Sequence, residues 1–281
     1  TSPDLFRSVP APSYPEIRLA LAGPRAVARR LERFRPDSIH IATEGPLGWA
    51  ARRYCLRQGL PFTTAYHTQF PDYIARRTRL PARWFWPFIR RFHAPAARTM
   101  VATRTIRDQL REQGVGPLHH WGRGVDVQTF HPDHAPPDLF FSLPRPIQLY
   151  VGRVAVEKNI EAFLANPHPG SKVVVGSGPA LDRLRAQFPD AHFLGKRTGD
   201  ALAACYAGAD VFVFPSKTDT FGLVMIEALA CGTPVAAYPV PGPLDVLEPA
   251  SGVMADRLGD AIAGAIRLER SRCHSIGRQF T

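Results

Sequence analysis

Residues 210–246 constrain the fold of this chain more than any other segment. They begin with Val211–Phe214, a continuous run of β-branched and aromatic residues that is typical of a parallel strand covered on both faces. Pro215 ends that run, and residues 223–231 have the composition of a helix. A second apolar strand is expected at residues 235–238. Strand, loop, helix and strand in this order predict a parallel α/β sheet.

Two carboxylates flank the start of the predicted helix. Asp219 lies in the loop after the first strand, and Glu227 lies on the first turns of the helix. Ligands of open α/β sheets bind outside the carboxyl ends of the strands. A helix that begins there offers unpaired N–H groups to a phosphate or a hydroxyl-rich ligand. Spacing alone nevertheless favours a simpler interpretation, in which both acids are solvated surface carboxylates.

Length and charge narrow the class of protein. The chain has 281 residues, of which 45% are hydrophobic, and this is enough for two compact domains. The formal net charge of +11 favours an anionic partner such as nucleic acid, anionic lipid or a phosphorylated substrate. An arginine excess also arises from a GC-rich genome, without any such partner.

Targeting signals and cysteines indicate a compartment. No run of eighteen apolar residues is present and no signal peptide is recognised, so we expect a cytoplasmic protein. The four cysteines are widely spaced and are expected to be reduced thiols, not a zinc site or a disulfide framework. They are Cys55, Cys205, Cys231 and Cys273.

Glycines and cations follow the predicted strands of the second half. Gly152 and Arg153 come directly after a strand at residues 148–151, and Lys158 begins the next helix. Gly178 follows another strand, where a glycine allows close approach of a ligand to the backbone. Taken singly, the two cations are ordinary solvated side chains, and the Gly-Ser-Gly turn is a weak signal.

Together these residues resemble the donor-site signature of the retaining family-four glycosyltransferases. That signature is a glutamate, seven residues and a second glutamate, with Phe-Gly just after the first acid. Here Asp219 stands in the first position and Glu227 in the second, with Phe221 and Gly222 between them. Aspartate in the first position is a departure from the family pattern. The resemblance implies an α/β GT-B fold of two Rossmann-like domains.

The resemblance also implies roles for these side chains. The second acid would hold the ribose hydroxyls of a nucleotide, and the first acid with the backbone after it would hold the sugar. Two cations and a helix N-terminus would stabilise the departing nucleoside diphosphate, so we expect no metal and no other cofactor. The predicted catalytic residues are Arg153, Lys158, Asp219 and His67. The predicted donor-binding residues are Gly152, Gly178, Lys196, Arg197, Thr220, Phe221, Gly222, Leu223 and Glu227.

The first half of the chain is expected to form the acceptor-side domain. His67 follows a predicted strand at residues 61–66. The resemblance places a histidine near this position in contact with the sugar or the acceptor. A lone histidine is more often structural. The turn at residues 43–46 lies at the same edge of the sheet and is either an acceptor contact or a plain strand-to-helix turn. Residues 1–14 are proline-rich and show no periodicity.

A basic and aromatic stretch lies between these elements. Residues 73–107 contain nine arginines and no acid. Tryptophan and arginine together suit the headgroup level of an anionic bilayer, so part of this stretch is predicted to contact a membrane or lipid acceptor. An amphipathic helix that packs its aromatic face into its own domain is an equal alternative. Nucleic-acid binding is less favoured because no recognised module is present. The six predicted contacts are Arg83, Trp84, Phe85, Trp86, Arg90 and Arg91.

Domain boundaries follow from composition and from the resemblance. We predict domains at residues 1–132 and 147–281, joined by a polar, proline-rich linker at 133–146. The family begins with a strand, a glycine-rich loop and a helix that have no counterpart here, so the first domain is expected to lack its first β-α-β units. The chain ends about where the family's C-terminal crossing helix would begin.

The predicted reaction joins these features. The chain is similar to the branch of the family that glycosylates lipids, including sulfoquinovosyl- and glycosyl-diacylglycerol synthases and phosphatidylinositol mannosyltransferases. We therefore predict a retaining hexosyltransferase that uses a nucleoside diphosphate sugar and a lipid acceptor at the cytoplasmic face of the membrane. A soluble acceptor of polysaccharide synthesis is the alternative within the class. A non-catalytic sugar-nucleotide-binding remnant is the alternative outside it.

Overall fold

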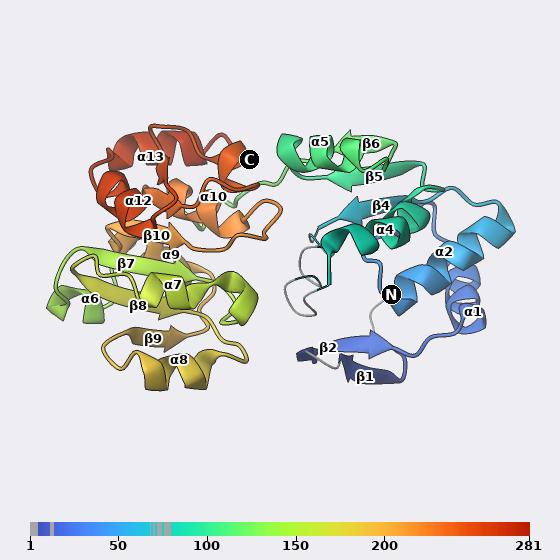
Figure 1. The fold of residues 1–281 in the computed structure, drawn as a ribbon, viewed down its shortest axis with the longest axis horizontal. Helices are drawn as coiled ribbons and strands as arrows, with labels where there is room; N and C mark the ends of the chain where they lie inside the picture. Colours follow the sequence, from blue (N-terminus) through green and yellow to red (C-terminus); the bar gives the residue numbers. More distant parts are fainter. Residues whose placement is uncertain (1–4, 12–13, 68, 70, 72–74, 76–79) are drawn as a thin grey trace. The chain divides into compact units, whose positions relative to one another are not determined.

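The chain folds into two compact units, residues 1–122 and 123–281 (Figure 1). The computed structural model describes residues 5–11, 14–67, 69, 71, 75 and 80–281. The segment predicted as a linker, residues 133–146, lies inside the second unit and contains helix α6 (Leu139–Ser142). Part of the basic stretch, at residues 73–74 and 76–79, lies outside the described residues, as do Thr68, Phe70 and Asp72.

The first unit contains a parallel sheet of four strands that are neighbours in chain order. The strands are β3 (His40–Ile41), β4 (Thr63–Tyr66), β5 (Arg98–Val101) and β6 (Leu118–His120). The helices around them are α1 (Pro24–Phe34), α2 (Pro46–Gln58), α4 (Trp86–His93) and α5 (Arg104–Glu112), with a 3₁₀ turn η2 (Ala82–Trp84) before α4. Helices α1 and α2 each begin at a proline, whose fixed φ suits the first helical position.

A β-hairpin precedes this sheet. Strand β1 (Ser8–Ala11), within the stretch that showed no periodicity, pairs antiparallel with β2 (Tyr14–Ala20). The pairing shifts register between Pro10 and Ala11. A proline-bearing strand of this kind gives no alternating pattern that a sequence could reveal.

One tryptophan of the basic stretch belongs to the core of this unit. Trp86 is 7% exposed and stacks on Tyr66, with ring centroids 6.4 Å apart. It packs in a buried cluster with Ile89, Val101 and Ile106. Its prediction as a membrane contact is therefore wrong, because the alternative of an amphipathic helix packed into its own domain holds for this side chain. Arg83, Trp84, Arg90 and Arg91 lie on the exposed part of the stretch, and Phe85 is half-buried.

The second unit contains a parallel sheet of six strands in the order β12-β11-β10-β7-β8-β9. The strands are β7 (Ile147–Val151), β8 (Ser171–Val175), β9 (His192–Gly195), β10 (Val211–Phe214), β11 (Val235–Ala237) and β12 (Gly252–Met254). This is the strand order of a doubly wound dinucleotide-binding fold. The first three strands are added toward one edge of the sheet, and the fourth strand is added on the other side of the first. Here that switch point lies between β7 and β10.

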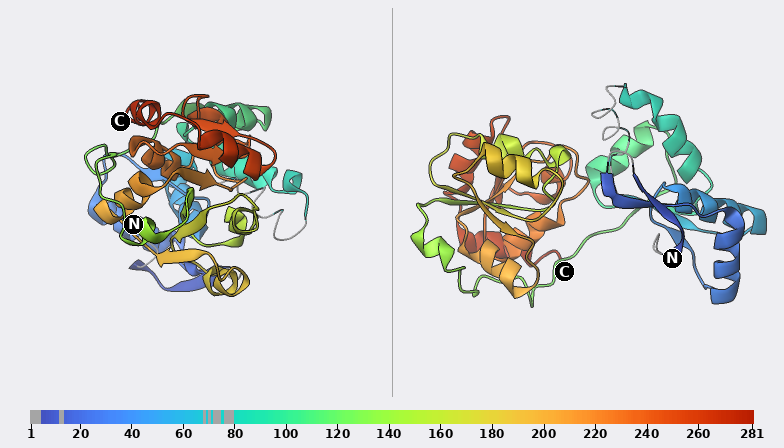
Figure 2. Two further views of the ribbon diagram at one scale, coloured as in Figure 1. Left: turned by 90° about the vertical axis from the view of Figure 1, so that its left-hand side faces the viewer. Right: turned by 90° about the horizontal axis from the view of Figure 1, so that it is seen from below.

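Helices cover both faces of this sheet (Figure 2). On one face, Val211 and Val213 pack with residues of α7 (Ile160–Leu164), α8 (Leu181–Gln187) and α12 (Leu258–Ala265). On the other, Phe212 contacts Tyr206 of helix α9 (Asp200–Gly208), with ring centroids 5.6 Å apart. The remaining helices are α10 (Leu223–Ala230), α11 (Pro243–Val246) and α13 (Arg270–Gly277). A strand with both faces covered explains the uninterrupted apolar run.

Among the described residues, no helix combines the length and the apolarity that crossing a lipid bilayer requires.

Candidate functional site

Most of the predicted donor-site residues lie at the switch point of the second sheet. Strands β7 and β10 are adjacent, with Phe212 paired to Leu149. Gly152 and Arg153 come directly after β7, and the loop of residues 215–222 comes directly after β10. Ligands of open α/β sheets bind outside the carboxyl ends of the strands at such a point.

An ion pair joins the two loops. Nζ of Lys158, at the end of the 3₁₀ turn η3 (Val156–Lys158), lies 2.6 Å from Oδ1 of Asp219. The Lys158 and Asp219 side chains are only 25% and 23% exposed. Nδ2 of Asn159 also donates a 3.1 Å hydrogen bond to the carbonyl oxygen of Pro215. The structure therefore brings together two of the residues predicted as catalytic from distant parts of the chain.

Arg153 is held by a residue that the sequence analysis did not single out. Its Nη2 lies 2.8 Å from Oε1 of Glu157, four residues further along the chain. Its carbonyl oxygen accepts a hydrogen bond from the hydroxyl of Tyr150 at 2.9 Å. An acid four residues from a cation is a visible sequence signal, and it was available here. Arg153 and Lys158 thus each have a carboxylate partner.

Glu227 is positioned by a buried tyrosine. It lies on helix α10, which begins after Gly222 in the left-handed region with φ +86°. Oε2 of Glu227 accepts a hydrogen bond of 2.9 Å from the hydroxyl of Tyr206. Burial raises the pKa of the Glu227 carboxyl, although the hydrogen bond from Tyr206 acts in the opposite direction. The pKa of Tyr206 is raised well above its ordinary value by burial and then by the charge of Glu227.

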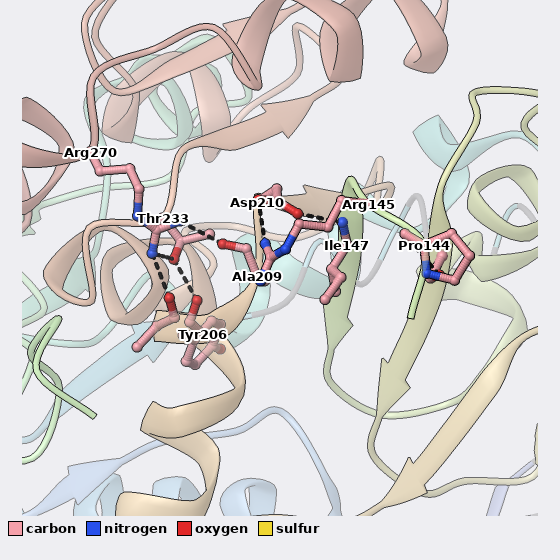
Figure 3. A network of polar contacts seen from close by, with 10 residues as sticks. Pro144, Arg145, Ile147, Tyr206, Ala209, Asp210, Thr233 and Arg270 are labelled. Carbon is pink, nitrogen blue, oxygen red and sulfur yellow. Dashed lines mark hydrogen bonds and ion pairs between the residues drawn. The ribbon is translucent and has the colours of Figure 1, made fainter. Parts of the chain in front are cut away.

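A polar network supports this tyrosine from behind (Figure 3). The Tyr206 carbonyl accepts a 2.6 Å hydrogen bond from Oγ1 of Thr233. Arg270 of helix α13 donates to that same Oγ1 at 3.3 Å and to the Ala209 carbonyl at 2.5 Å. Asp210 continues the network to the start of β7 by accepting from the Ile147 N–H at 2.6 Å. Helix α13 therefore fixes the end of the helix that carries Tyr206.

Gly178 has a structural reason to be glycine. Its φ is +155°, and a Cβ atom there would lie 2.4 Å from the carbonyl oxygen of Val154. The N–H of Val154 donates a 2.8 Å hydrogen bond to the Ser177 carbonyl, so the loops after β7 and β8 are joined. Lys196 and Arg197, by contrast, are exposed after β9, the edge strand two places from β7.

The loop after β10 is largely buried and contains an unused donor. Thr220 and Phe221 are buried, whereas Leu223 at the start of α10 is exposed. Ser216 is 1% exposed, and its hydroxyl has no hydrogen-bond partner among the described residues. The loop after β11 packs on this segment, since a Cβ on Gly242 would lie 3.1 Å from the Phe221 carbonyl oxygen. Ser216 was not predicted, because a serine after a strand has no distinctive pattern.

His67 lies at the carboxyl end of β4 in the first unit. Its ring is 6.2 Å from the ring of Trp121, which follows β6. Trp121 also meets His40 edge-on at 5.9 Å. The histidine is therefore half-buried beside an aromatic partner that the sequence analysis did not name.

The turn at residues 43–46 carries a carboxylate held by buried polar groups. Oε1 of Glu44 lies 3.2 Å from Nε2 of His93, on helix α4. Nδ1 of His93 lies 2.8 Å from Oγ1 of Thr64, and that hydroxyl lies 3.0 Å from Oγ1 of Thr99. His93, Thr64 and Thr99 are fully buried. Glu44 is thus oriented by strands β4 and β5 and by α4, an arrangement that no local pattern predicts.

Comparison with known proteins identifies the family. The model of Glycosyltransferase Family 4 matches residues 2–129, and that of Glycosyl transferases group 1 matches residues 145–268. A GDP-mannose-dependent alpha-mannosyltransferase of Mycobacterium tuberculosis (strain CDC 1551 / Oshkosh) is 34% identical over 279 residues, covering 94% of this chain and 74% of that protein. The chain belongs to the family-four glycosyltransferases.

Further comparisons agree with this assignment. A GDP-mannose-dependent alpha-(1-6)-phosphatidylinositol dimannoside mannosyltransferase of Mycobacterium tuberculosis (strain ATCC 25177 / H37Ra) is 30% identical, over 89% of this glycosyltransferase and 69% of that protein. A sucrose-phosphate synthase from Thermosynechococcus elongatus has a TM-score of 0.75 at 24% identity, over 92% of this chain and 72% of that one. The glycosyltransferase therefore has the GT-B fold that its sequence predicted. It spans 50% to 74% of the length of four relatives that match it over most of its residues.

Proposed function

We propose that this family-four glycosyltransferase moves a hexose from a nucleoside diphosphate sugar to a membrane lipid, with retention of configuration at the anomeric carbon. The observation that carries the proposal is the gathering of Lys158, Asp219 and Glu227 at the switch point of the second sheet. These residues come from three different elements, and buried partners hold Glu227 in place.

The acids and the buried hydroxyl fit the neutral part of a donor. The Glu227 carboxylate has acceptor oxygens for the ribose hydroxyls of a nucleotide. We assign Asp219, in the loop before α10, to the hydroxyls of the sugar, and the Ser216 hydroxyl is a further donor without a partner among the described residues. Both mycobacterial relatives named above are GDP-mannose-dependent, which supports a nucleoside diphosphate sugar as the donor here. The base and the sugar of the donor are left open.

The cations fit the leaving group. When the bond between the anomeric carbon and the phosphate oxygen breaks, negative charge grows on the nucleoside diphosphate. Arg153 and Lys158 can stabilise that charge from fixed positions, since Glu157 and Asp219 orient them. We therefore propose that the reaction needs no metal ion. Transfer should proceed at an unchanged rate in EDTA, and loss of transfer that added Mg²⁺ restores would contradict this part.

A lipid acceptor accounts for features of the first unit. Trp84 is 59% exposed, and Arg83, Arg90 and Arg91 are exposed around it. Such a surface suits the headgroup level of an anionic membrane. One of the relatives is named for a phosphatidylinositol dimannoside, which is a lipid acceptor. We propose that the enzyme acts as a peripheral protein on the cytoplasmic face of the membrane.

A transfer assay tests the proposal. The chain is incubated with radiolabelled GDP- and UDP-hexoses and with vesicles that contain diacylglycerol or phosphatidylinositol, and the products are extracted into organic solvent. The proposal predicts a labelled glycolipid whose anomeric configuration, read by NMR, matches that of the donor. An inverted product would contradict retention. Label in a water-soluble product alone would favour the soluble-acceptor alternative. Nucleotide binding without any transfer would favour the non-catalytic remnant.

A further inference from the structure

A groove in the first unit carries four arginines, of which only Arg91 belongs to the exposed surface around Trp84 described above. It runs along helix α2, between the start of α1 and the end of α4, and has a volume of about 670 Å³. That volume is within the range of small-ligand sites, roughly 300–1,000 Å³. We call it the arginine groove and define it by Pro24, Trp49, Arg53, Leu56, Arg57 and Arg91.

Positive charge in the arginine groove is not balanced by acids. Of the residues that the structure describes, four arginines and no carboxylate line it. Among the described residues, the guanidinium groups of Arg53, Arg57 and Arg91 make no ion pair, and all three side chains are exposed. Low-dielectric walls focus the field of such charges, so an anion of matching size is attracted to the groove.

The fourth arginine shapes the groove. Arg52 donates to the carbonyl of Phe92 at 3.0 Å and to that of Arg91 at 2.6 Å, so it ties α2 to the end of α4. Its guanidinium also lies over the ring of Trp49, 5.0 Å from the centroid. Burial lowers the pKa of Arg52, and the neighbouring charge of Arg91 lowers it further. A bound anion would relieve that repulsion.

Apolar side chains accompany the charge. Leu56 lines the groove and is 48% exposed. Trp49 packs against Phe88, which is itself 38% exposed, with ring centroids 5.2 Å apart. The indole nitrogen of Trp49 is buried and has no hydrogen-bond partner among the described residues, so the wall also holds an unused donor. A free phosphate or a nucleic-acid backbone offers nothing apolar to Leu56, whereas a phospholipid offers both a phosphate and the base of its acyl chains.

We propose that the arginine groove binds the phosphate-bearing headgroup of an anionic membrane phospholipid and so docks the first unit on the bilayer. The groove is distinct from the donor site, which lies wholly in the second unit. The proposal rests on the proposed function only in taking a bilayer as the place of the reaction.

Vesicle sedimentation with the whole chain tests the groove. The chain should bind vesicles of three parts phosphatidylcholine to one part phosphatidylglycerol, and bind phosphatidylcholine alone weakly. Replacing the three unpaired cations in Arg53→Gln/Arg57→Gln/Arg91→Gln should weaken binding on the order of 100-fold. The variant Arg53→Lys/Arg57→Lys/Arg91→Lys keeps the charge and should bind within about threefold of the wild type.

A matched control separates the effect of the groove on vesicle binding from the effect of net charge. Arg257→Gln/Arg267→Gln/Arg278→Gln removes the same charge from exposed positions of the second unit and should leave vesicle affinity unchanged. Equal losses in the two triple variants would overturn the proposal, because net charge would then suffice. Equal binding to both kinds of vesicle would overturn it as well. Tighter binding to duplex DNA than to vesicles, with the same dependence on the three arginines, would assign the groove to nucleic acid instead.

Two further measurements keep the result decisive. If the groove variant has a lowered melting temperature, the single variant Arg57→Gln replaces it, with an expected loss of about fivefold. Nucleoside diphosphate binding is measured on the same samples. Nucleotide binding without vesicle binding would overturn the groove proposal and leave the donor site standing. Vesicle binding without nucleotide binding would support the groove proposal and contradict the donor site.

Discussion

At the scale of single residues, the site depends on pairs rather than on isolated groups. Lys158 is paired with Asp219, Arg153 with Glu157, and Glu227 with Tyr206. The first of these pairs unites two residues that the sequence could name but not place together. Glu157 could have been found from its spacing to Arg153, whereas Tyr206 became visible only in the folded chain, because packing between helices α9 and α10 brings it to Glu227.

Replacing Lys158 tests the role of the cations. Lys158→Met keeps an unbranched side chain that is one atom shorter, and removes the charge that would face the diphosphate. We expect kcat to fall by about 10²–10³, as when one electrostatic contact to a developing oxyanion is lost. Steady-state kinetics with saturating donor measure this. A variant that keeps its kcat and changes only KM would show that Lys158 binds the donor without acting on the leaving group.

Ionisation of Glu227 should lower the free energy of unfolding as pH rises. Its pKa in the folded chain is raised above the ordinary value of about 4.5, so the folded state binds more protons than the unfolded state between those two values. The wild type therefore loses stability as pH rises through this window. Glu227→Gln retains an acceptor for the Tyr206 hydroxyl and carries no such charge. We expect the melting temperature of Glu227→Gln to exceed that of the wild type at pH 7.

Thermal unfolding at several pH values measures the difference between the two proteins. The excess in melting temperature of Glu227→Gln over the wild type should shrink as pH falls toward 4.5 and vanish below it. A melting temperature difference that is constant with pH would show that the carboxyl of Glu227 titrates alike in the folded and unfolded chains.

At the scale of elements, apolar runs and glycines predicted the second sheet well. The expected strands at 148–151, 211–214 and 235–238 correspond to β7, β10 and β11 within one residue. Short elements without a distinctive pattern were not predicted, among them α11, β12 and the hairpin β1–β2. Their conformations depend on what they pack against, which a local pattern does not contain.

The two tryptophans beside α4 should behave differently. Trp86→Ala removes a buried ring from the cluster around Ile89 and should lower the free energy of unfolding by about 3–5 kcal/mol. Trp84→Ala removes an exposed ring and should change that free energy by less than about 0.5 kcal/mol. Urea titrations of both variants give the comparison. Equal losses would contradict the burial of Trp86.

Gly178 should tolerate no side chain. The Cβ atom of Gly178→Ala would lie 2.4 Å from the Val154 carbonyl oxygen, so the loops after β7 and β8 must separate. We expect a loss of about 1–3 kcal/mol in the free energy of unfolding. At Gly195 a Cβ would meet nothing within 4 Å and φ is positive, so Gly195→Ala serves as the control for backbone strain alone. Equal losses in the two variants would show that strain, and not the approach of Val154, explains Gly178.

At the scale of the molecule, charge and chemistry are divided between two units. The donor-site residues gather in the second unit, whereas the arginine groove and the Glu44–His93 pair lie in the first. The sequence predicted two α/β domains, and it named most of the residues that lie at the switch point of the second sheet, because strand ends and acids follow local rules. It did not predict the groove, because Arg53, Arg57 and Arg91 come from two helices that only packing brings together.

The central claim is that the switch point of the second sheet holds a nucleoside diphosphate. Calorimetric titration with UDP, GDP and ADP tests this on the wild type, on Glu227→Gln and on Glu248→Gln. Glu248 is an exposed acid of the same unit. It precedes β12 and so lies toward the amino ends of the strands, whereas the site lies at their carboxyl ends. We predict that one nucleotide binds the wild type and Glu248→Gln equally, and binds Glu227→Gln about 10- to 100-fold more weakly, since a hydrogen bond to a charged group is lost. Equal affinity in all three proteins, or no binding to any of them, would contradict the account.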